Sequence, residues 1–366
     1  MRMNTPRLPR RQTRTIWVGS VPVGGGAPIA VQSMTKTDTR DVRATVAEIR
    51  RLAAEGCEII RLAVPDREAA SALGAIKKKA NLPVIADIHF DHRLALAALG
   101  AGVDGLRLNP GNIGSRDKIR EVVRAAKERN VPIRIGVNSG SLEKDLLQKS
   151  GGRATAGAMV ESALRHVRIL EDLDFRLIKI SLKASDVLRT VAAYRLLAGK
   201  VDYPFHAGIT EAGGLLAGSV KSAAGLAILL NEGLADTIRV SLTAPPEDEV
   251  KAAYQILGAL DLRRRRPVVI SCPTCGRAEV DVLAIAAEVE RRVADIAVPF
   301  TVAVMGCMVN GPGEAREADI GLACGRSKAA IFKRGRLVRQ VPEKAIVREF
   351  LKEVFKLAEE RPHDKK

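Results

Sequence analysis

Between about residues 29 and 260, short apolar segments alternate with helical patterns of ten or more residues, and this rhythm limits the possible folds more than any other feature. Helix patterns such as Asp41–Glu55 and Asp248–Leu260 have an acidic residue near the start. Eight strand-and-helix units in about 230 residues have the count and size of a closed (β/α)8 barrel, so we predict a TIM-type barrel of the α/β class. A doubly wound open sheet is the alternative, although it seldom repeats eight times so evenly. The predicted strands are Ile29–Ser33, Glu58–Ala63, Val84–Ile88, Asp104–Leu108, Ile133–Val137, Leu177–Leu182, Pro204–Ile209 and Thr237–Leu242.

The rhythm ends at a run of four arginines, Arg263–Arg266, followed by a proline. We therefore predict a barrel domain over residues 1–262, which includes a small hairpin at 13–23, and a basic linker over 263–267. Residues 268–366 have the irregular order of elements that is typical of a small α+β domain. Its predicted elements are strands at Val268–Ser271, at Phe300–Met305 and near Ile320 and Ile331, with helices at Val280–Asp295 and Glu343–Glu360.

The composition restricts the class of partner. A net charge of +17 favours an anionic partner, whereas an aromatic content of 3% leaves few platforms for stacking bases, so we expect no nucleic-acid binding. No apolar run reaches membrane-spanning length and the basic N-terminus lacks an apolar core, so we expect a cytoplasmic protein without membrane contact. Five cysteines in 366 residues do not form the pattern of a disulfide framework and fit a reducing compartment.

Polar and cationic residues lie where the interior of a barrel is usually apolar. Because alternate residues of a barrel strand point into the lumen, residues spaced i, i+2 near the strand ends share one face. Such a set converges at the C-terminal mouth, where barrels keep their active sites. The residues with this placement are Arg61, Asp87, His89, Arg107, Asn109, Arg134, Gly136, Asn138, Lys179, Ser181, Lys183, His206, Gly208, Thr210, Arg239, Ser241 and Thr243, with Glu211 just beyond.

So many cations in one lumen would repel each other and lose hydration without an anion. A diphosphate fits this lining, because Arg binds phosphate with two hydrogen bonds and Lys binds it as a point charge. The alternative is that these side chains point outward or pair with carboxylates.

The second predicted domain carries a soft-metal pattern. Cys272 and Cys275 form a C-x-x-C pair, Cys307 follows the next strand, and Glu314 ends a tight loop across Gly311–Gly313. Three thiols and one carboxylate predict an iron–sulfur cluster with one non-sulfur ligand. A structural zinc site is the alternative, although the second C-x-x-C or pair of histidines that a zinc ribbon needs is missing. We expect Cys57 to be a buried apolar residue, and Cys324 stays outside the predicted ligand set.

Nine segments closely resemble the 4-hydroxy-3-methylbut-2-enyl diphosphate synthase family, in its shorter bacterial two-domain form. The resemblance extends from about residue 12 to residue 350 and is carried by Ile29–Thr35, Gly56–Pro65, Ala86–Phe90, Arg107–Gly114, Ile135–Leu142, Gly208–Gly213, Ile238–Leu242, Cys272–Gly276 and Met305–Glu314.

The resemblance implies an iron–sulfur oxidoreductase of the non-mevalonate isoprenoid pathway. It implies reductive opening of 2-C-methyl-D-erythritol 2,4-cyclodiphosphate to the linear allylic diphosphate with loss of water. It also implies one 4Fe–4S cluster, flavodoxin or ferredoxin as the electron donor, and a head-to-tail homodimer in which one subunit's cluster domain caps the other's barrel. The implied cluster ligands are Cys272, Cys275, Cys307 and Glu314.

The resemblance also assigns residues in the barrel. Asp87, Thr210 and Glu211 would face the reacting carbons. Glu211 is our candidate acid for the departing hydroxyl, and pairing with a nearby Lys or Arg is its alternative role. The residues that would bind the diphosphate are Arg61, Arg107, Asn109, Arg134, Asn138, Lys183, Arg239 and Ser241.

Two other classes of protein remain to be weighed. A phosphate-binding barrel lyase or synthase with a structural zinc module is the first, and a nucleic-acid-binding protein is the second. The run Arg263–Arg266 is either a solvated linker or a docking surface for an acidic electron carrier, because opposite charges speed encounter.

Overall fold

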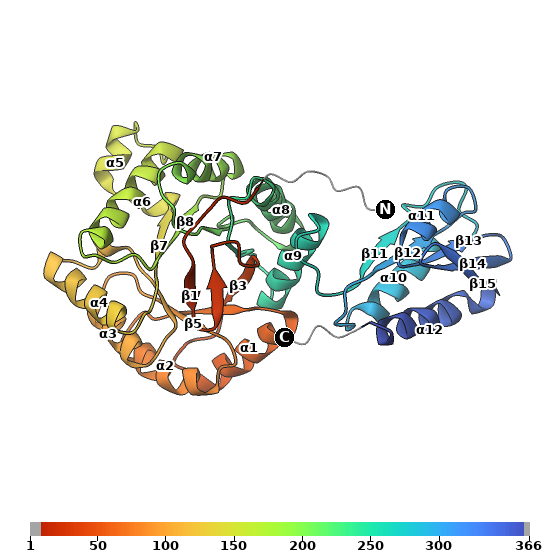
Figure 1. Ribbon diagram of the computed structural model, residues 1–366, viewed down its shortest axis with the longest axis horizontal. Helices are drawn as coiled ribbons and strands as arrows, with labels where there is room; N and C mark the ends of the chain where they lie inside the picture. Colours follow the sequence, from red (N-terminus) through yellow and green to blue (C-terminus); the bar gives the residue numbers. More distant parts are fainter. Residues whose placement is uncertain (1–8, 362–366) are drawn as a thin grey trace. The chain divides into compact units, whose positions relative to one another are not determined.

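The computed structural model describes residues 9–361 and divides the chain into two compact units, Met1–Leu260 and Asp261–Lys366 (Figure 1). Residues 263–267, near the start of the second unit, contain neither helix nor strand. No helix in the described part of the chain is long and apolar enough to cross a membrane.

The first unit contains an eight-stranded parallel sheet in the order β8-β7-β6-β5-β4-β3-β10-β9. A parallel bridge between Ile180 in β8 and Phe205, just before β9, brings the two ends of the sheet together. The predicted barrel and its eight strands are confirmed, although the last two strands are shorter than expected. The strands are β3 (Ala30–Met34), β4 (Ile59–Ala63), β5 (Val84–Asp87), β6 (Gly105–Arg107), β7 (Ile133–Asn138), β8 (Ile178–Lys183), β9 (His206–Ala207) and β10 (Thr237–Ile238).

A helix follows every barrel strand, and these helices form the outer ring that Figure 1 shows. Several begin at an aspartate, such as Asp41, Asp66 and Asp186, whose carboxylate accepts a backbone N–H of the first turn. The short helix α5 (Lys144–Lys149) in the loop after β7 was not predicted. The eight helices are α1 (Val42–Glu55), α2 (Arg67–Lys79), α3 (His92–Gly100), α4 (Arg116–Glu128), α6 (Ala156–Glu171), α7 (Val187–Ala198), α8 (Leu215–Asn231) and α9 (Pro246–Ala259).

The predicted N-terminal hairpin is present as β1 (Ile16–Val18) and β2 (Val21–Val23). Its apolar face packs against Ala30, Ile59 and Ile85 at the N-terminal ends of barrel strands. The hairpin therefore fills the end of the lumen opposite the mouth with apolar side chains.

The second unit is a five-stranded mixed sheet in the order β11-β12-β13-β14-β15. Helices α10 (Val282–Val293) and α12 (Ile346–Glu359) share an apolar core with one face, and Ala315 of α11 (Gly311–Glu317) packs with Ala323, Ala330 and Phe332. Figure 1 accordingly shows α11 across the sheet from α10 and α12. The strands are β11 (Val268–Ser271), β12 (Thr301–Met305), β13 (Ile320–Cys324), β14 (Lys328–Lys333) and β15 (Arg336–Pro342).

One local prediction for this unit was wrong. We expected a rigid loop across Gly311–Gly313, but these residues begin the short helix α11 (Gly311–Glu317). Pro312 occupies the first turn, where its missing N–H removes no helical hydrogen bond and its fixed φ suits a helix start. The strand β15 was also not predicted.

Candidate functional site

A polar cavity of about 130 Å³ lies at the C-terminal ends of the barrel strands. Five cations line it together with one carboxylate. The lining residues are Arg61, Asp87, His89, Arg107, Arg134, Asn138, Ser181, Lys183, Thr210, Arg239 and Ser241. Nine of these lining residues are among those predicted to bind the diphosphate or to face the reacting carbons, and the structure brings them together in one cavity.

Strand pairing explains why these side chains meet. Registered residues of neighbouring strands point to the same face of a sheet. Asp87 is registered with Arg107, and Arg107 with Arg134, while Asn138 is registered with Lys183. One inward-facing residue therefore fixes the direction of its neighbours around the barrel.

Asp87 is the only carboxylate in the cavity lining among the described residues. Its oxygens lie 3.2 Å from Nη1 of Arg107 and 3.6 Å from Nε of Arg61. Burial alone would raise the pKa of Asp87, but Arg61, His89 and the other cations outweigh it and hold the pKa well below its usual value. Asp87 is therefore ionised and neutralises part of the charge of two arginines.

The remaining cations are poorly neutralised. Arg134 is 3% exposed, and its Nη1 reaches only the hydroxyl of Ser181 at 3.4 Å, while its Nε has no partner. Burial, reinforced by neighbouring arginines, lowers the pKa of Arg134 and of Lys183 far below their usual values and that of Arg61 to about 10. The cavity is therefore arranged for a ligand with several negative charges.

The sequence did not reveal all the neighbours of the cations. The sulfur of Met34, in the first barrel strand, lies 2.8 Å from Nη2 of Arg61 and 3.7 Å from Nη1 of Arg239. Glu249 of α9 lies 3.8 Å from Nη2 of Arg239 and 3.3 Å from Nζ of Lys36. Applying the i, i+2 rule to the first strand would have found Met34, whereas Glu249 comes from a helix and has no such signal.

Two of the assigned barrel residues lie outside the cavity lining. Asn109 is buried, and its side chain both donates to the Gly136 carbonyl at 3.0 Å and accepts from the Gly136 N–H at 2.8 Å. Glu211 is exposed at a left-handed φ of 52°, and within residues 9–361 no Lys or Arg pairs with it. Asn109 therefore holds the backbone of β7 in place, and an acid role for Glu211 stays a prediction.

In the second unit, the three thiols of the predicted ligand set lie near one sheet edge. The strands β11 and β12 are parallel neighbours, so the segments that leave their carboxyl ends start side by side. The N–H of Cys272 donates to the Val304 carbonyl at 2.9 Å, and Cys307 lies two residues beyond β12. The side chain of Cys275 is exposed, that of Cys272 is half-buried, and that of Cys307 is buried.

The surroundings of two thiols favour the thiolate, which is the form that binds metals. Backbone N–H groups of Asn310, Val309 and Gly311 at the start of α11 lower the pKa of Cys307. Hydrogen bonds from Arg277 lower the pKa of Cys275, and the nearby Cys307 raises it slightly. These two cysteines therefore act on each other and share a cationic surrounding.

The donor types of the predicted ligand set fit an iron–sulfur cluster. Within residues 9–361, no group of three or more His, Cys, Asp or Glu side chains is placed to hold one metal ion. A four-iron cluster binds each thiolate through a different iron, so its ligands surround a larger body. The exposed Glu314, in the first turn of α11, lies on the same short helix that begins beside Cys307. The residues present therefore fit an iron–sulfur cluster, because their donor types suit iron and they lie in the same part of the second unit.

Two cysteines and the arginine run complete the predicted features. Cys57 and Cys324 are buried in apolar surroundings, and burial raises the pKa of each thiol to about 12, so both remain protonated. Arg263–Arg266 are half-buried and engaged in interactions, such as the 3.3 Å pair between Arg264 and Asp261. The docking role of this run stays a prediction.

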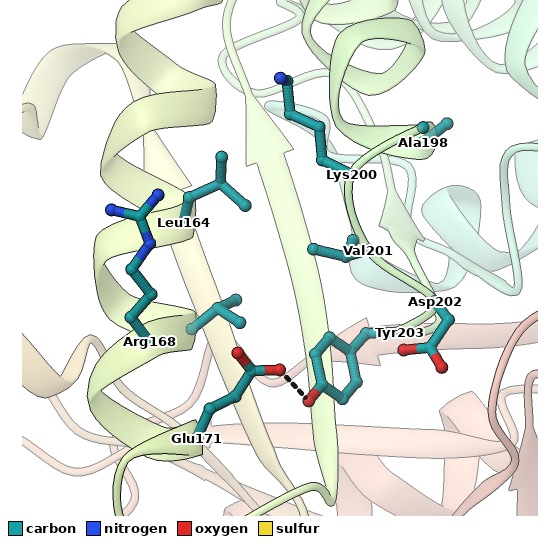
Figure 2. A pocket seen from close by; sticks show the side chains of 10 residues that line it. Leu164, Arg168, Glu171, Ala198, Lys200, Val201, Asp202 and Tyr203 are labelled. Atoms are coloured by element: carbon teal, nitrogen blue, oxygen red, sulfur yellow. Dashed lines mark hydrogen bonds between the residues drawn. The ribbon is translucent and has the colours of Figure 1, made fainter.

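A wider groove lies outside the barrel, between α6 and the segment that leads into β9 (Figure 2). The hydroxyl of Tyr203 donates to Glu171 at 2.7 Å, and Asp202 pairs with Arg14 at 2.7 Å. The carboxylates of the groove are therefore already paired, and its lining shows no excess of buried charge like that of the lumen.

The first unit defines a (β/α)8-barrel protein with a lumen for anions, to which the second unit adds a thiol-bearing domain. Two domain models of one known family match these parts in the same order. The family model described as the GcpE TIM-barrel domain matches residues 13–254, and that of the GcpE protein C-terminal domain matches residues 268–356. The chain belongs to the GcpE family, which confirms the resemblance found in the sequence.

Curated relatives match over nearly the whole chain. A protein of Geobacter sulfurreducens is 61% identical, with 96% of this chain and 99% of the relative covered. A protein of Maridesulfovibrio salexigens is 59% identical, with 94% and 96% covered. Both are named 4-hydroxy-3-methylbut-2-en-1-yl diphosphate synthase (flavodoxin). Among solved structures, a dihydropteroate synthase of Xanthomonas albilineans has a TM-score of 0.47 at 13% identity, with 68% of this chain and 97% of that chain covered.

Proposed function

We propose that this chain reductively opens 2-C-methyl-D-erythritol 2,4-cyclodiphosphate to 4-hydroxy-3-methylbut-2-enyl diphosphate, with loss of water, in the non-mevalonate isoprenoid pathway. The family assignment supports this reaction, and the single observation that carries it is the cationic lumen with one carboxylate against five cations. A ring C–O bond to phosphate breaks, the hydroxyl leaves as water with one added proton, and two electrons complete the balance.

Arg61, Arg107, Arg134, Lys183 and Arg239 bind the diphosphate in the lumen. Their charges neutralise the oxygen that departs from carbon, and this stabilisation needs no reorganisation because the side chains are held by buried strands. Asn138, Thr210 and Ser241 complete the lining with neutral donors that orient the ligand.

Asp87 and Glu211 are the candidates for handling protons. Asp87 is ionised, so it holds Arg61 and Arg107 in position rather than donating a proton. Glu211, exposed in the loop that follows β9, is the acid that protonates the departing hydroxyl once substrate covers it.

Cys272, Cys275, Cys307 and Glu314 hold one 4Fe–4S cluster. When bound, the cluster supplies the electrons of the reaction one at a time. The carboxylate of Glu314 is a harder and weaker ligand for iron than a thiolate, which leaves one corner exchangeable. The N–H groups at the start of α11 lower the pKa of Cys307 and so favour the thiolate form that the cluster requires.

Partners and location follow from the same assignment. Flavodoxin, which is part of the relatives' names, is the proposed electron donor, and ferredoxin is the alternative. A cytoplasmic location and a head-to-tail homodimer complete the proposal. We expect neither nucleic acid nor membrane as a partner.

The decisive experiment uses anaerobically purified protein with the cyclic diphosphate and reduced flavodoxin. We expect brown protein with a broad band near 400 nm, about four irons per chain, and formation of the linear allylic diphosphate. Colourless, zinc-containing protein that makes no such product would instead support the lyase or synthase alternative. Salt-dependent RNA binding at physiological ionic strength would support the nucleic-acid alternative.

A further inference from the structure

A second polar layer lies beneath the cavity. Lys179, Ser181 and Lys183 alternate along β8 and point into the lumen, but Lys179 does not line the cavity. Lys179 is registered with Arg134 on the neighbouring strand β7 and is 1% exposed. Arg134, which lines the ligand cavity, is therefore the direct strand neighbour of a buried lysine that does not line it.

Lys179 has no counterion. Its Nζ has no hydrogen-bond partner, and within residues 9–361 it forms no ion pair. The titratable groups that act on it are Arg134 of β7, His206 of β9 and Asp236, just before β10. Asp236 is engaged elsewhere, because it accepts from Arg10 at 2.9 Å and from the N–H of Phe205 at 2.8 Å.

The neighbours of Lys179 favour its neutral form. A buried ammonium without a counterion is costly, and the adjacent Arg134 adds repulsion. Burial first, and then Arg134, lower the pKa of Lys179 to about 7, with only Asp236 acting in the opposite direction. His206 is neutral because burial and nearby cations, including Lys183, lower its pKa, and its Nδ1 lies 2.8 Å from the Thr237 hydroxyl.

We propose that Lys179 is a neutral amine in the ligand-free barrel and takes up a proton when a diphosphate enters the cavity above it, so that substrate binding is coupled to proton uptake. Lys179 is a positioning residue and does not touch the ligand. The ligand's negative charge compensates Arg134, which removes the repulsion that keeps Lys179 neutral. The protonated lysine then adds one positive charge to the floor of the site. This inference rests on the proposed diphosphate site.

Isothermal titration of the anaerobic holoenzyme with inorganic diphosphate, in buffers of different ionisation enthalpy at pH 8, counts the protons taken up. We compare the natural chain with Lys179→Met, which replaces the amine with an apolar side chain of similar length. Any change in the protonation of diphosphate itself is the same in both proteins. The difference between their proton counts therefore reports the protonation of Lys179. We expect Lys179→Met to take up close to one proton fewer, and its affinity to weaken less between pH 7 and pH 8.5.

Lys78→Met is the matched control, because Lys78 is an exposed lysine of α2 and its loss changes the net charge equally. The control should keep the proton count of the natural chain. Tight binding with the same proton count in Lys179→Met would overturn the inference and leave the diphosphate site standing. If the variant failed to fold, the natural chain would be titrated with sulfate, which carries no proton at pH 8, and binding of sulfate without proton uptake would overturn the inference. No binding of diphosphate to the natural chain would overturn the site and the inference together.

Discussion

Arg134 is the cation on which the binding site depends most, because it is buried at the centre of the lumen without a carboxylate partner. Such a side chain lowers the stability of the ligand-free protein and is retained for the ligand. Binding and stability should therefore respond in opposite directions when it is removed.

Arg134→Met should raise KM for the cyclic diphosphate roughly 10- to 100-fold, because a charged hydrogen-bonded contact contributes ~1.5–3 kcal/mol. The same change should stabilise the ligand-free protein by about 1 kcal/mol or more, because it removes an uncompensated buried charge. Steady-state kinetics and urea unfolding measure the two effects. Arg120→Met, which breaks an exposed pair with Asp117, should change neither. A large loss of stability in Arg134→Met would contradict the conclusion that Arg134 is an uncompensated buried charge in the ligand-free protein.

The cysteines differ in environment and should differ in their effect on iron content. Cys307→Ala removes a thiolate that backbone N–H groups stabilise, so anaerobic protein should contain far less iron and sulfide. Glu314→Ala leaves three thiolates and should give an intermediate content that falls quickly in air.

Cys324→Ala is the matched control, because this thiol is protonated and lies in the apolar core. It should keep its iron and lose about 1 kcal/mol of stability. Equal iron in Cys307→Ala and in the natural chain would remove Cys307 from the ligand set.

The stability of the ligand-free protein should rise with pH from 7 to 8.5. The pKa of Lys179 is about 7 in the folded protein, against 10.5 ordinarily, so in this range the unfolded chain binds more protons than the folded one. The slope from this residue is at most ~1.4 kcal/mol per pH unit. Urea unfolding at both pH values should show a smaller rise in Lys179→Met. An identical rise in the two proteins would contradict a depressed pKa for Lys179.

At the scale of elements, two glycines on inward-facing positions make room for the cations. A Cβ at Gly136 in β7 would lie 2.6 Å from Nε of Arg107, and one at Gly208 would lie 2.3 Å from the backbone oxygen of Arg239 and 2.9 Å from Nζ of Lys183. All three contacts are closer than non-bonded atoms allow. The strands therefore alternate large cations with glycine so that the guanidinium groups fit inside the lumen.

Gly136→Ala should displace the guanidinium of Arg107 and raise KM roughly 10- to 100-fold, since small misplacements of binding groups are costly. Gly140→Ala is the control, because a Cβ there meets no atom within 4 Å. If Gly136→Ala had normal stability and unchanged kinetics, Arg107 could move aside without loss of binding. That result would contradict the need for glycine at this position.

At the scale of the whole molecule, the anion site and the thiols belong to separate compact units. The proposed homodimer would let the barrel of one subunit work with the cluster domain of its partner. This arrangement can be distinguished from one within a single subunit by mixing inactive variants.

Cys307→Ala and Arg134→Met should each be nearly inactive when the substrate concentration is well below KM. When the two variants are mixed in equal amounts and exchange subunits, the mixture should regain activity. In a head-to-tail dimer, each mixed dimer has one complete site, so random exchange should restore about a quarter of the natural activity. Recovery is measured against each variant mixed with itself. No recovery, with exchange verified by mass spectrometry of tagged subunits, would contradict a site shared between subunits.

The amino-acid sequence alone determined the eight strand-and-helix units, the inward face of the strands and the two cysteine loops. These features depend on periodicity over a few residues, because neighbouring side chains alternate across a strand and recur every turn of a helix. The lining of the lumen followed from the same alternation, as Arg107, Arg134 and Lys183 show. The helical start at Pro312 was missed because adjacent glycines favour a loop equally well.

Only the tertiary structure decided which polar side chains are paired. Asn109 binds the backbone of β7, Glu249 reaches Arg239 from a helix, and Lys179 remains without a counterion. Each of these facts depends on segments far apart in the sequence that meet when the barrel closes between β8 and β9. Charge compensation acts through distances in space, so residue order could place the cations in the lumen but could not say which of them would be neutralised.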